Sequence, residues 1–250
     1  MTHAQPQDTQ AHPRANTILG ALPEADLARL TPSLEAVSLT RDVVLEEPDV
    51  PIEYVYFPVA GVASLLALGA DGESVDTTMV GREGMTGLAV FLGTRQMPVR
   101  TMVQIPLTGY RLPASVLRAE LERGGLLVNL LHRYTQVVMV SMAQLILCNR
   151  VHRLDQRAAR WLLQVDERVD EARFEVTHEF LADMIGTQRP SISLAMSQFK
   201  DAGLITYSRG RIVIMDRDGL LERACGCITV MHEEERRLRE TTEAYGIGAA

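Results

Sequence analysis

The most informative stretch of the 250-residue chain runs from residue 176 to residue 205 and reads VTHEFLADMIGTQRPSISLAMSQFKDAGLI. Thr177 is a residue type that caps helix N-termini, and apolar residues follow it at helical spacing. Gly186 then offers the backbone freedom that a tight turn needs, and a second helix is expected to run on to Ala202. Two short helices joined by a glycine-containing turn predict a helix-turn-helix unit.

The residues that follow this unit predict a β-hairpin. Gly203 is suited to the C-terminal end of the second helix. Two β-rich runs come next, Leu204–Tyr207 and Arg211–Met215, joined by Ser208-Arg209-Gly210. A hairpin directly behind the second helix predicts the wing of a winged helix-turn-helix.

The polar face of the second helix is suited to DNA. A helix N-terminus attracts phosphate through its free N–H groups, and arginine and glutamine side chains can read guanine and adenine. Residues 187–214 carry a net charge of +3, although the whole chain carries −7, and Lys200, the only lysine, lies in this window. The residues expected to contact DNA are Thr187, Gln188, Arg189, Ser191, Ser193, Leu194, Ser197, Lys200 and Arg209.

Residues 17–115 predict a small β-roll that acts as a sensor domain. Short β-rich runs alternate there with turn residues, which is typical of a barrel or roll. Residues 1–115 hold 7 basic and 13 acidic side chains, so most of the negative charge lies away from the predicted DNA-binding surface. Residues 1–16 are polar and lack periodicity, and we expect a disordered tail.

A long helix is predicted for residues 116–148. Apolar residues recur there at spacings of three and four, close to the period of a coiled coil. A helix of this length extends well beyond a small barrel, which favours a dimerisation helix over a purely internal one. The DNA-binding domain then covers residues 149–222, and residues 223–250 form a C-terminal tail. The expected dimer interface consists of Leu127, Leu131, Tyr134, Val138, Ser141 and Leu145.

The quoted stretch resembles the DNA-binding module of the Crp/Fnr superfamily of bacterial transcription factors, and Val151–Leu163 resembles the first helix of that domain. The resemblance implies an α+β chain with an N-terminal cyclic-nucleotide-binding-like β-roll, a dimerisation helix and a C-terminal winged helix-turn-helix. It also implies a homodimer that reads a two-fold-symmetric operator.

The resemblance assigns roles to individual positions of the second helix. Arg189 matches the arginine that family members use to read a base, and Ser191 matches a hydroxyl that contacts phosphate. Pro190 and Leu194 stand where the best-known members carry a charged base-reading pair. We therefore expect an operator that differs from the family's consensus site.

The sensor domain is expected to carry a degenerate cyclic-nucleotide cassette. In members that bind cyclic nucleotides, the cassette begins with Gly-Glu and ends with Arg-Ser or Arg-Thr. Here Met85 follows Gly84, and methionine cannot accept a ribose hydroxyl as a carboxylate does. The effector is therefore expected not to be cyclic AMP; the arginines of this region could bind another anion or be surface charges. The candidate pocket consists of Arg82, Glu83, Gly84, Met85, Arg100 and Thr101.

The three cysteines are too few and too late in the chain for a disulfide framework, and a reducing compartment fits them best. The iron–sulfur sensing known in the family needs a cysteine cluster near the N-terminus, but no cysteine precedes Cys148. Cys148 and His152 lie four apart and could share a metal, and Cys225-Gly226-Cys227 could form a metal or redox pair. Incidental thiols are the favoured interpretation, so we expect neither a metal nor a cofactor.

Enzyme signatures such as a Walker loop or a nucleophile elbow are absent, and residues 17–115 contain no histidine that could serve a metal oxygenase. Neither a signal peptide nor a membrane span is expected. The sequence predicts a cytoplasmic, non-enzymatic regulator whose partners are double-stranded DNA, RNA polymerase and an unknown small-molecule effector. Two alternatives stay open: a constitutive regulator without an effector, and a ligand-binding or protein-interaction module whose winged helix does not read DNA.

Overall fold

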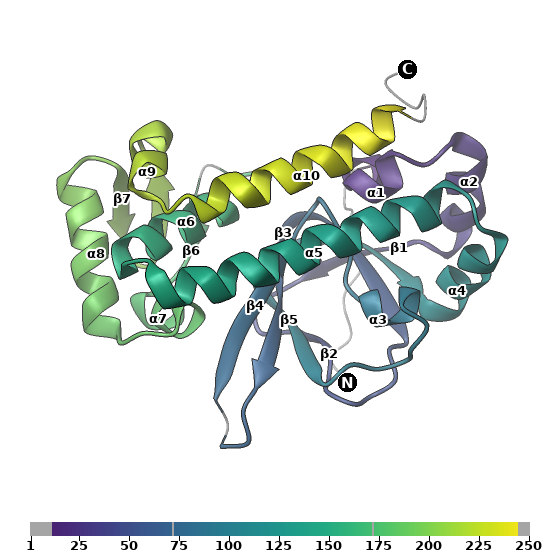
Figure 1. The fold of residues 1–250 in the computed structure, drawn as a ribbon, viewed down its shortest axis with the longest axis horizontal. Coiled ribbons are helices and arrows are strands. Elements are labelled where there is room, and N and C mark those ends of the chain that lie inside the picture. The colour runs from purple at the N-terminus through teal and green to yellow at the C-terminus, as the bar shows by residue number, and fades with distance from the viewer. Residues whose placement is uncertain (1–11, 72, 172, 245–250) are drawn as a thin grey trace.

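The computed structural model describes residues 12–71, 73–171 and 173–244, and it confirms the predicted α+β class. A β-sheet domain, a long helix and a C-terminal helical domain with a small sheet follow one another along the chain (Figure 1). The helices are α1 (Thr17–Gly20), α2 (Glu24–Leu30), α3 (Leu88–Phe91), α4 (Ala114–Arg123), α5 (Leu126–Val151), α6 (Leu154–Asp166), α7 (His178–Ile185), α8 (Arg189–Asp201), α9 (Arg217–Arg223) and α10 (Cys227–Ala244). The strands are β1 (Glu35–Leu39), β2 (Val44–Glu46), β3 (Tyr54–Leu68), β4 (Ser74–Val80), β5 (Val99–Pro113), β6 (Arg173–Glu175), β7 (Ile205–Ser208) and β8 (Arg211–Ile214).

The N-terminal sheet is antiparallel, with the strand order β1-β5-β3-β4, and β2 also pairs with β5. Strands β3 and β5 are 15 residues long and pair with each other along nearly their whole length. Their register shifts around Gly61, which has a φ of 89° and lies so close to β5 that a Cβ atom would sit 2.1 Å from the carbonyl oxygen of Pro106. Glycine therefore permits the bend that curls the two long strands.

The predicted tail is partly wrong, because residues 12–16 belong to the folded domain, whereas residues 1–11 lie outside the described residues. Asn16 is fully buried, and its side-chain oxygen accepts hydrogen bonds from the backbone of Ile18 and Leu19 at the start of α1. Its amide nitrogen donates to the carbonyl oxygens of Pro58 and Gly84. Asn16 thus fixes the start of the folded domain, although nothing in the sequence distinguishes it.

The long helix α5 begins at Leu126, ten residues later than predicted, and ends at Val151. Gly124 and Gly125 have φ values of 77° and 92°, and they separate α5 from the shorter α4. Glycine reaches positive φ without steric cost, so this pair ends one helix and allows the next to start in a new direction. Among the described residues, no helix combines the length and apolar character needed to cross a membrane.

Most of the predicted C-terminal tail is in fact the helix α10, residues 227–244, which runs alongside α5 (Figure 1), whereas residues 245–250 lie outside the described residues. Leu238 lies in the core of the N-terminal domain, and Ile228 lies in the core of the C-terminal domain. Gln136 on α5 also donates a hydrogen bond of 2.9 Å to Glu234 on α10. The segment is rich in charged residues, but its few apolar residues pack against both domains.

Candidate nucleic-acid interface

The helix-turn-helix is built by local signals that act as predicted. The hydroxyl oxygen of Thr177 accepts a hydrogen bond of 3.1 Å from the backbone of Phe180 and caps α7. Gly186 ends this helix in the left-handed region, with a φ of 68°. Pro190 lies in the first turn of α8, where its missing N–H removes no helical hydrogen bond.

One face of α8 packs into the core, so only the side chains on the opposite face reach solvent. Ile192, Met196 and Phe199 are buried in one core cluster with Trp161 on α6 and Leu181 on α7. The opposite face stays exposed and includes Leu194, an apolar side chain that is 62% exposed. The exposed residues from the helix start through this face are Gln188, Arg189, Pro190, Ser191, Leu194, Ser197 and Gln198.

The wing is a three-stranded sheet with the order β6-β8-β7. Ser208 pairs with Arg211 across the hairpin, so two residues form the loop. Both have positive φ, 51° at Arg209 and 80° at Gly210, as a type I′ turn requires. This geometry places Arg209 at the exposed tip, whereas the third strand, β6, was not predicted.

Three basic side chains of this region remain available to a nucleic acid. Arg189 opens α8, Lys200 lies near its end and Arg209 lies on the wing, and all three are exposed. Within the described part of the chain they form no salt bridge, whereas Arg211 pairs with Glu175 at 2.9 Å. Phosphate and base groups can therefore approach these charges without displacing an internal partner.

Two of the predicted contact residues have structural partners. Ser193 is half-buried, and its hydroxyl shares a hydrogen bond of 2.9 Å with Nδ1 of His178, whose ring stacks on Tyr207 at 4.4 Å. Burial and the charge of Arg189 lower the pKa of His178. Thr187 is also half-buried, and its backbone N–H donates to the carbonyl oxygen of Ala182. These residues position the helices and the wing.

Four of the predicted effector-pocket residues contact elements outside the β-roll. Arg82 pairs with Asp170 at 2.5 Å, and Glu83 forms a buried ion pair with Arg168 at 2.9 Å. Gly84 packs so tightly on α5 that a Cβ atom would lie 2.1 Å from the ring of Tyr134. Met85 is buried, and its carbonyl oxygen accepts a hydrogen bond from the hydroxyl of the same tyrosine.

The other two candidates lie elsewhere. Arg100 forms an exposed ion pair with Glu47, at 2.9 Å. Thr101 is buried and pairs in the sheet with Glu46, a buried carboxylate that the sequence analysis did not name. Burial raises the pKa of Glu46, although the hydroxyls of Thr86 and Thr101 favour its ionised form. The six candidates do not form one site, and the only sequence signal of Glu46 was an acidic residue in an apolar run.

Most of the residues predicted to form the dimer interface are buried within their own chain. Leu127, Leu131, Tyr134 and Val138 belong to the N-terminal core, with α10 packed against α5 on the same domain. Ser141 and Leu145 are half-buried. The exposed side of α5 instead carries a stripe at spacings of four and three, which consists of Met139, Ala143 and Ile146.

The three cysteines, interpreted from the sequence as incidental thiols, lie close together in the structure. Cys148, Cys225 and Cys227 form one buried cluster at the end of α5, and His152 lies beside them. Contacts over about 75 residues bring them together, and no local pattern reveals such contacts.

Comparisons with known proteins agree with this architecture. The family model of the Crp-like helix-turn-helix domain matches residues 156–223. The HTH-type transcriptional regulator Cmr of Mycobacterium tuberculosis is 42% identical over 86 residues, which is 34% of this chain and 34% of that protein. The CRP-like cAMP-activated global transcriptional regulator of the same species is 25% identical over 222 residues, 84% of this chain and 97% of that protein. The solved structure of FixK2 from Bradyrhizobium japonicum shares the fold, with a TM-score of 0.65, 19% identity and coverage of 77% of this chain and 98% of that one.

Proposed function

Because this chain is a DNA-binding transcriptional regulator of the Crp/Fnr family and not an enzyme, we propose that it reads a two-fold-symmetric operator as a homodimer. Each subunit would place the N-terminal half of α8 in a major groove, with the two helices one turn of DNA apart. The observation that carries this proposal is Arg189, the first residue of α8, which is exposed and forms no salt bridge with any residue that the structure describes.

The exposed residues of α8 and the wing divide into base readers and phosphate contacts. Arg189 is the base reader, because its guanidinium can donate two hydrogen bonds to guanine. Leu194 suits a thymine methyl group, which gives a role to an apolar side chain that is exposed in the free protein. Lys200 and Arg209 bind phosphates, as do the hydroxyls of Ser191 and Ser197 at the helix surface.

The dimer forms through the exposed stripe of α5. Met139, Ala143 and Ile146 are spaced as in a coiled-coil seam, and Met139 and Ile146 are 65% and 74% exposed in the single chain. Exposed apolar side chains at this spacing are typical of a surface that a second copy covers. The proposed interface thus stays on α5 but moves to the face that α10 leaves open.

The regulator acts in the cytoplasm with RNA polymerase, and a signal at the β-roll shifts the position of the DNA-binding domain. Such a shift requires an effector that binds two states with different affinities. The contacts of Arg82 and Glu83 with Asp170 and Arg168 support this route, because they connect the sensor directly to the segment that follows α6. The alternatives are constitutive binding without an effector and a winged helix that contacts proteins.

Selection of genomic fragments by the purified protein tests DNA reading and supplies the operator. The variant Arg189→Ala is then expected to bind the selected operator more weakly by about 1–3 kcal/mol and to lose discrimination at one base pair. Lys200→Ala should weaken all sequences alike and reduce the salt dependence. The control is Arg223→Ala, because Arg223 is exposed on α9, outside the helix-turn-helix. If no sequence is enriched, or if Arg189→Ala binds like the control, the proposed reading is wrong.

A further inference from the structure

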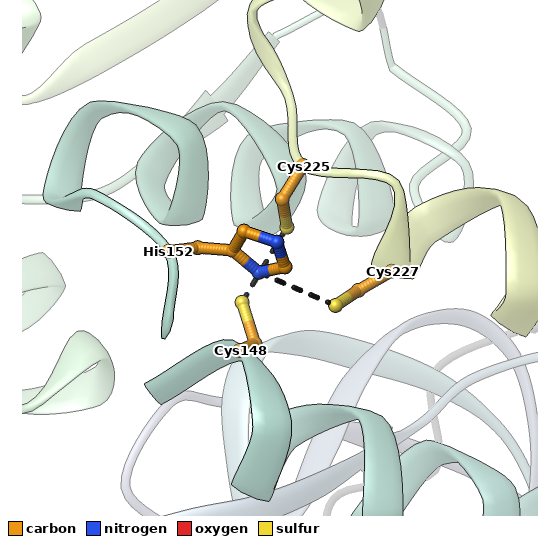
Figure 2. Close-up of side chains that lie close together, drawn as sticks. All are labelled: Cys148, His152, Cys225 and Cys227. Carbon is orange, nitrogen blue, oxygen red and sulfur yellow. Dashed lines mark hydrogen bonds between the residues drawn. The ribbon is translucent and has the colours of Figure 1, made fainter. Parts of the chain in front are cut away.

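Four side chains converge where the long helix meets the DNA-binding domain (Figure 2). Cys148 lies in the last turn of α5, and His152 is the residue directly after that helix. Cys225 lies just before α10, and Cys227 is the first residue of that helix. One ligand atom from each residue lies within 4.8 Å of all the others, and all three cysteines are buried.

The separations within this cluster match a single tetrahedral metal ion. The two Sγ atoms of Cys148 and Cys225 are 3.4 Å apart, and Sγ of Cys227 is 3.5 Å from Nδ1 of His152. Zinc binds sulfur at ~2.3 Å and imidazole nitrogen at ~2.0 Å, so a tetrahedron of such ligands has edges of ~3.5–3.8 Å. A multi-iron cluster does not fit this space, because several iron and sulfide ions must lie between its thiolates.

The surroundings also compensate the charge of such a site. Three thiolates and one neutral imidazole around Zn²⁺ leave a net charge of −1, which is costly to bury without a partner. Arg160 on α6 is buried within electrostatic reach of Cys148, so its positive charge can offset the negative charge of the site. Its Nη1 also donates to the side-chain oxygen of Gln164, which holds the guanidinium in place.

We propose that this protein binds one zinc ion through Cys148, His152, Cys225 and Cys227. Four protein ligands fill the tetrahedron and leave no open position, which is typical of a structural rather than a catalytic site. Binding displaces three thiol protons and uses the unprotonated Nδ1 of the imidazole. The ion would join the end of α5 to the start of α10 beside α6, and this role does not depend on the proposed DNA reading.

The test begins with the full-length wild-type protein, produced without a histidine tag and purified with a reducing agent. Elemental analysis should find one zinc and no iron per chain. After removal of zinc, Co²⁺ should give the visible bands of a tetrahedral site and the near-ultraviolet charge transfer of thiolate ligands. Zinc should also raise the melting temperature of the metal-free protein.

Variants then assign the ligands. His152→Ala and Cys227→Ser should each lower zinc affinity by at least tenfold and alter the cobalt spectrum. The matched control is His132→Ala, because His132 is an exposed histidine on the same helix α5. The control should keep zinc and the wild-type spectrum.

Several results would overturn the proposal. They are a wild-type protein that binds neither zinc nor cobalt, stoichiometric iron in place of zinc, or a disulfide among the cysteines in the reduced preparation. Zinc affinity that survives both ligand substitutions would also overturn it. The wild-type measurements are decisive even where a variant fails to fold, and none of them involves DNA.

Discussion

At the scale of single residues, Asp76 on β4 shows how burial couples this fold to pH. Its carboxylate is buried, and its Oδ1 atom has no hydrogen-bond partner among the described residues. Burial raises the pKa of Asp76 to about 7, although the charge of Arg160 and the hydroxyl of Ser64 oppose this shift. The folded chain therefore holds a proton on this residue at pH values where the unfolded chain has already released it.

The pKa of Asp76 leads to a prediction about stability. Between about pH 4 and pH 7 the folded state binds more protons at this residue than the unfolded state, so its contribution to the unfolding free energy falls as pH rises. Asp76→Asn lacks this pH dependence. The unfolding free energy of the variant minus that of wild type should therefore increase by up to roughly 4 kcal/mol as the pH rises from 4 to 8. Urea denaturation at several pH values measures the effect. The control is Asp42→Asn, because Asp42 is exposed; equal slopes in wild type and Asp76→Asn would contradict the assignment.

Residue-scale features were predictable from the sequence only where their cause is local. Thr177 caps its helix, Gly186 adopts positive φ and Arg189 stands exposed at a helix start, because neighbouring residues determine all three. The cluster of Cys148 with Cys225 depends on contacts between residues 77 apart. Spacing along the chain carries no information about such a contact.

At the scale of secondary-structure elements, the two long helices explain where the predictions failed. The apolar spacing of α5 correctly predicted a long helix. The face predicted to form the dimer interface, however, lies on the side of α5 that packs within its own chain. The helix α10 is rich in charged residues, so its apolar positions were overlooked. Because α10 covers part of α5, we propose the interface on the other side of the same helix.

The exposed stripe of α5 gives the prediction for this scale. Ile146→Glu should shift the protein from dimer to monomer in sedimentation, because a dimer would bury the new charge in an apolar seam. The folded monomer should tolerate the change, since this side chain is 74% exposed, and the circular dichroism spectrum should stay the same. The matched control is Leu92→Glu, at a position 56% exposed in the N-terminal domain. If both variants sediment as dimers, the interface does not lie on this stripe.

At the scale of the whole molecule, one arginine connects three parts of the chain. Arg168 follows α6 and is buried, and it pairs with Glu83 of the N-terminal domain at 2.9 Å and with Glu235 of α10 at 2.7 Å. Its Nη1 also donates to the carbonyl oxygen of Gln164. A buried charge with two opposite partners stabilises one relative arrangement of the two domains and the helix.

Removal of this arginine should therefore destabilise the protein strongly. Arg168→Ala leaves the buried carboxylate of Glu83 and the largely buried carboxylate of Glu235 without their partner, and breaking a buried ion pair typically costs about 3–5 kcal/mol. The matched control is Arg82→Ala, which removes the neighbouring and more exposed ion pair with Asp170. Loss of that pair should lower the unfolding free energy by at most about 1 kcal/mol. Chemical denaturation measures both. Similar small losses in the two variants would mean that the domains are held together by other contacts.

The course of α10 sets a limit on how the two domains can move. Ile228 is anchored in one core and Leu238 in the other, ten positions apart on a single helix. A helix of that length has a fixed span of ~15 Å and does not stretch. The helix therefore fixes the distance between the two cores. The domains can pivot about its ends, but they can separate only if Ile228 or Leu238 leaves its core. Large opening motions should consequently occur in steps and not as a continuous drift.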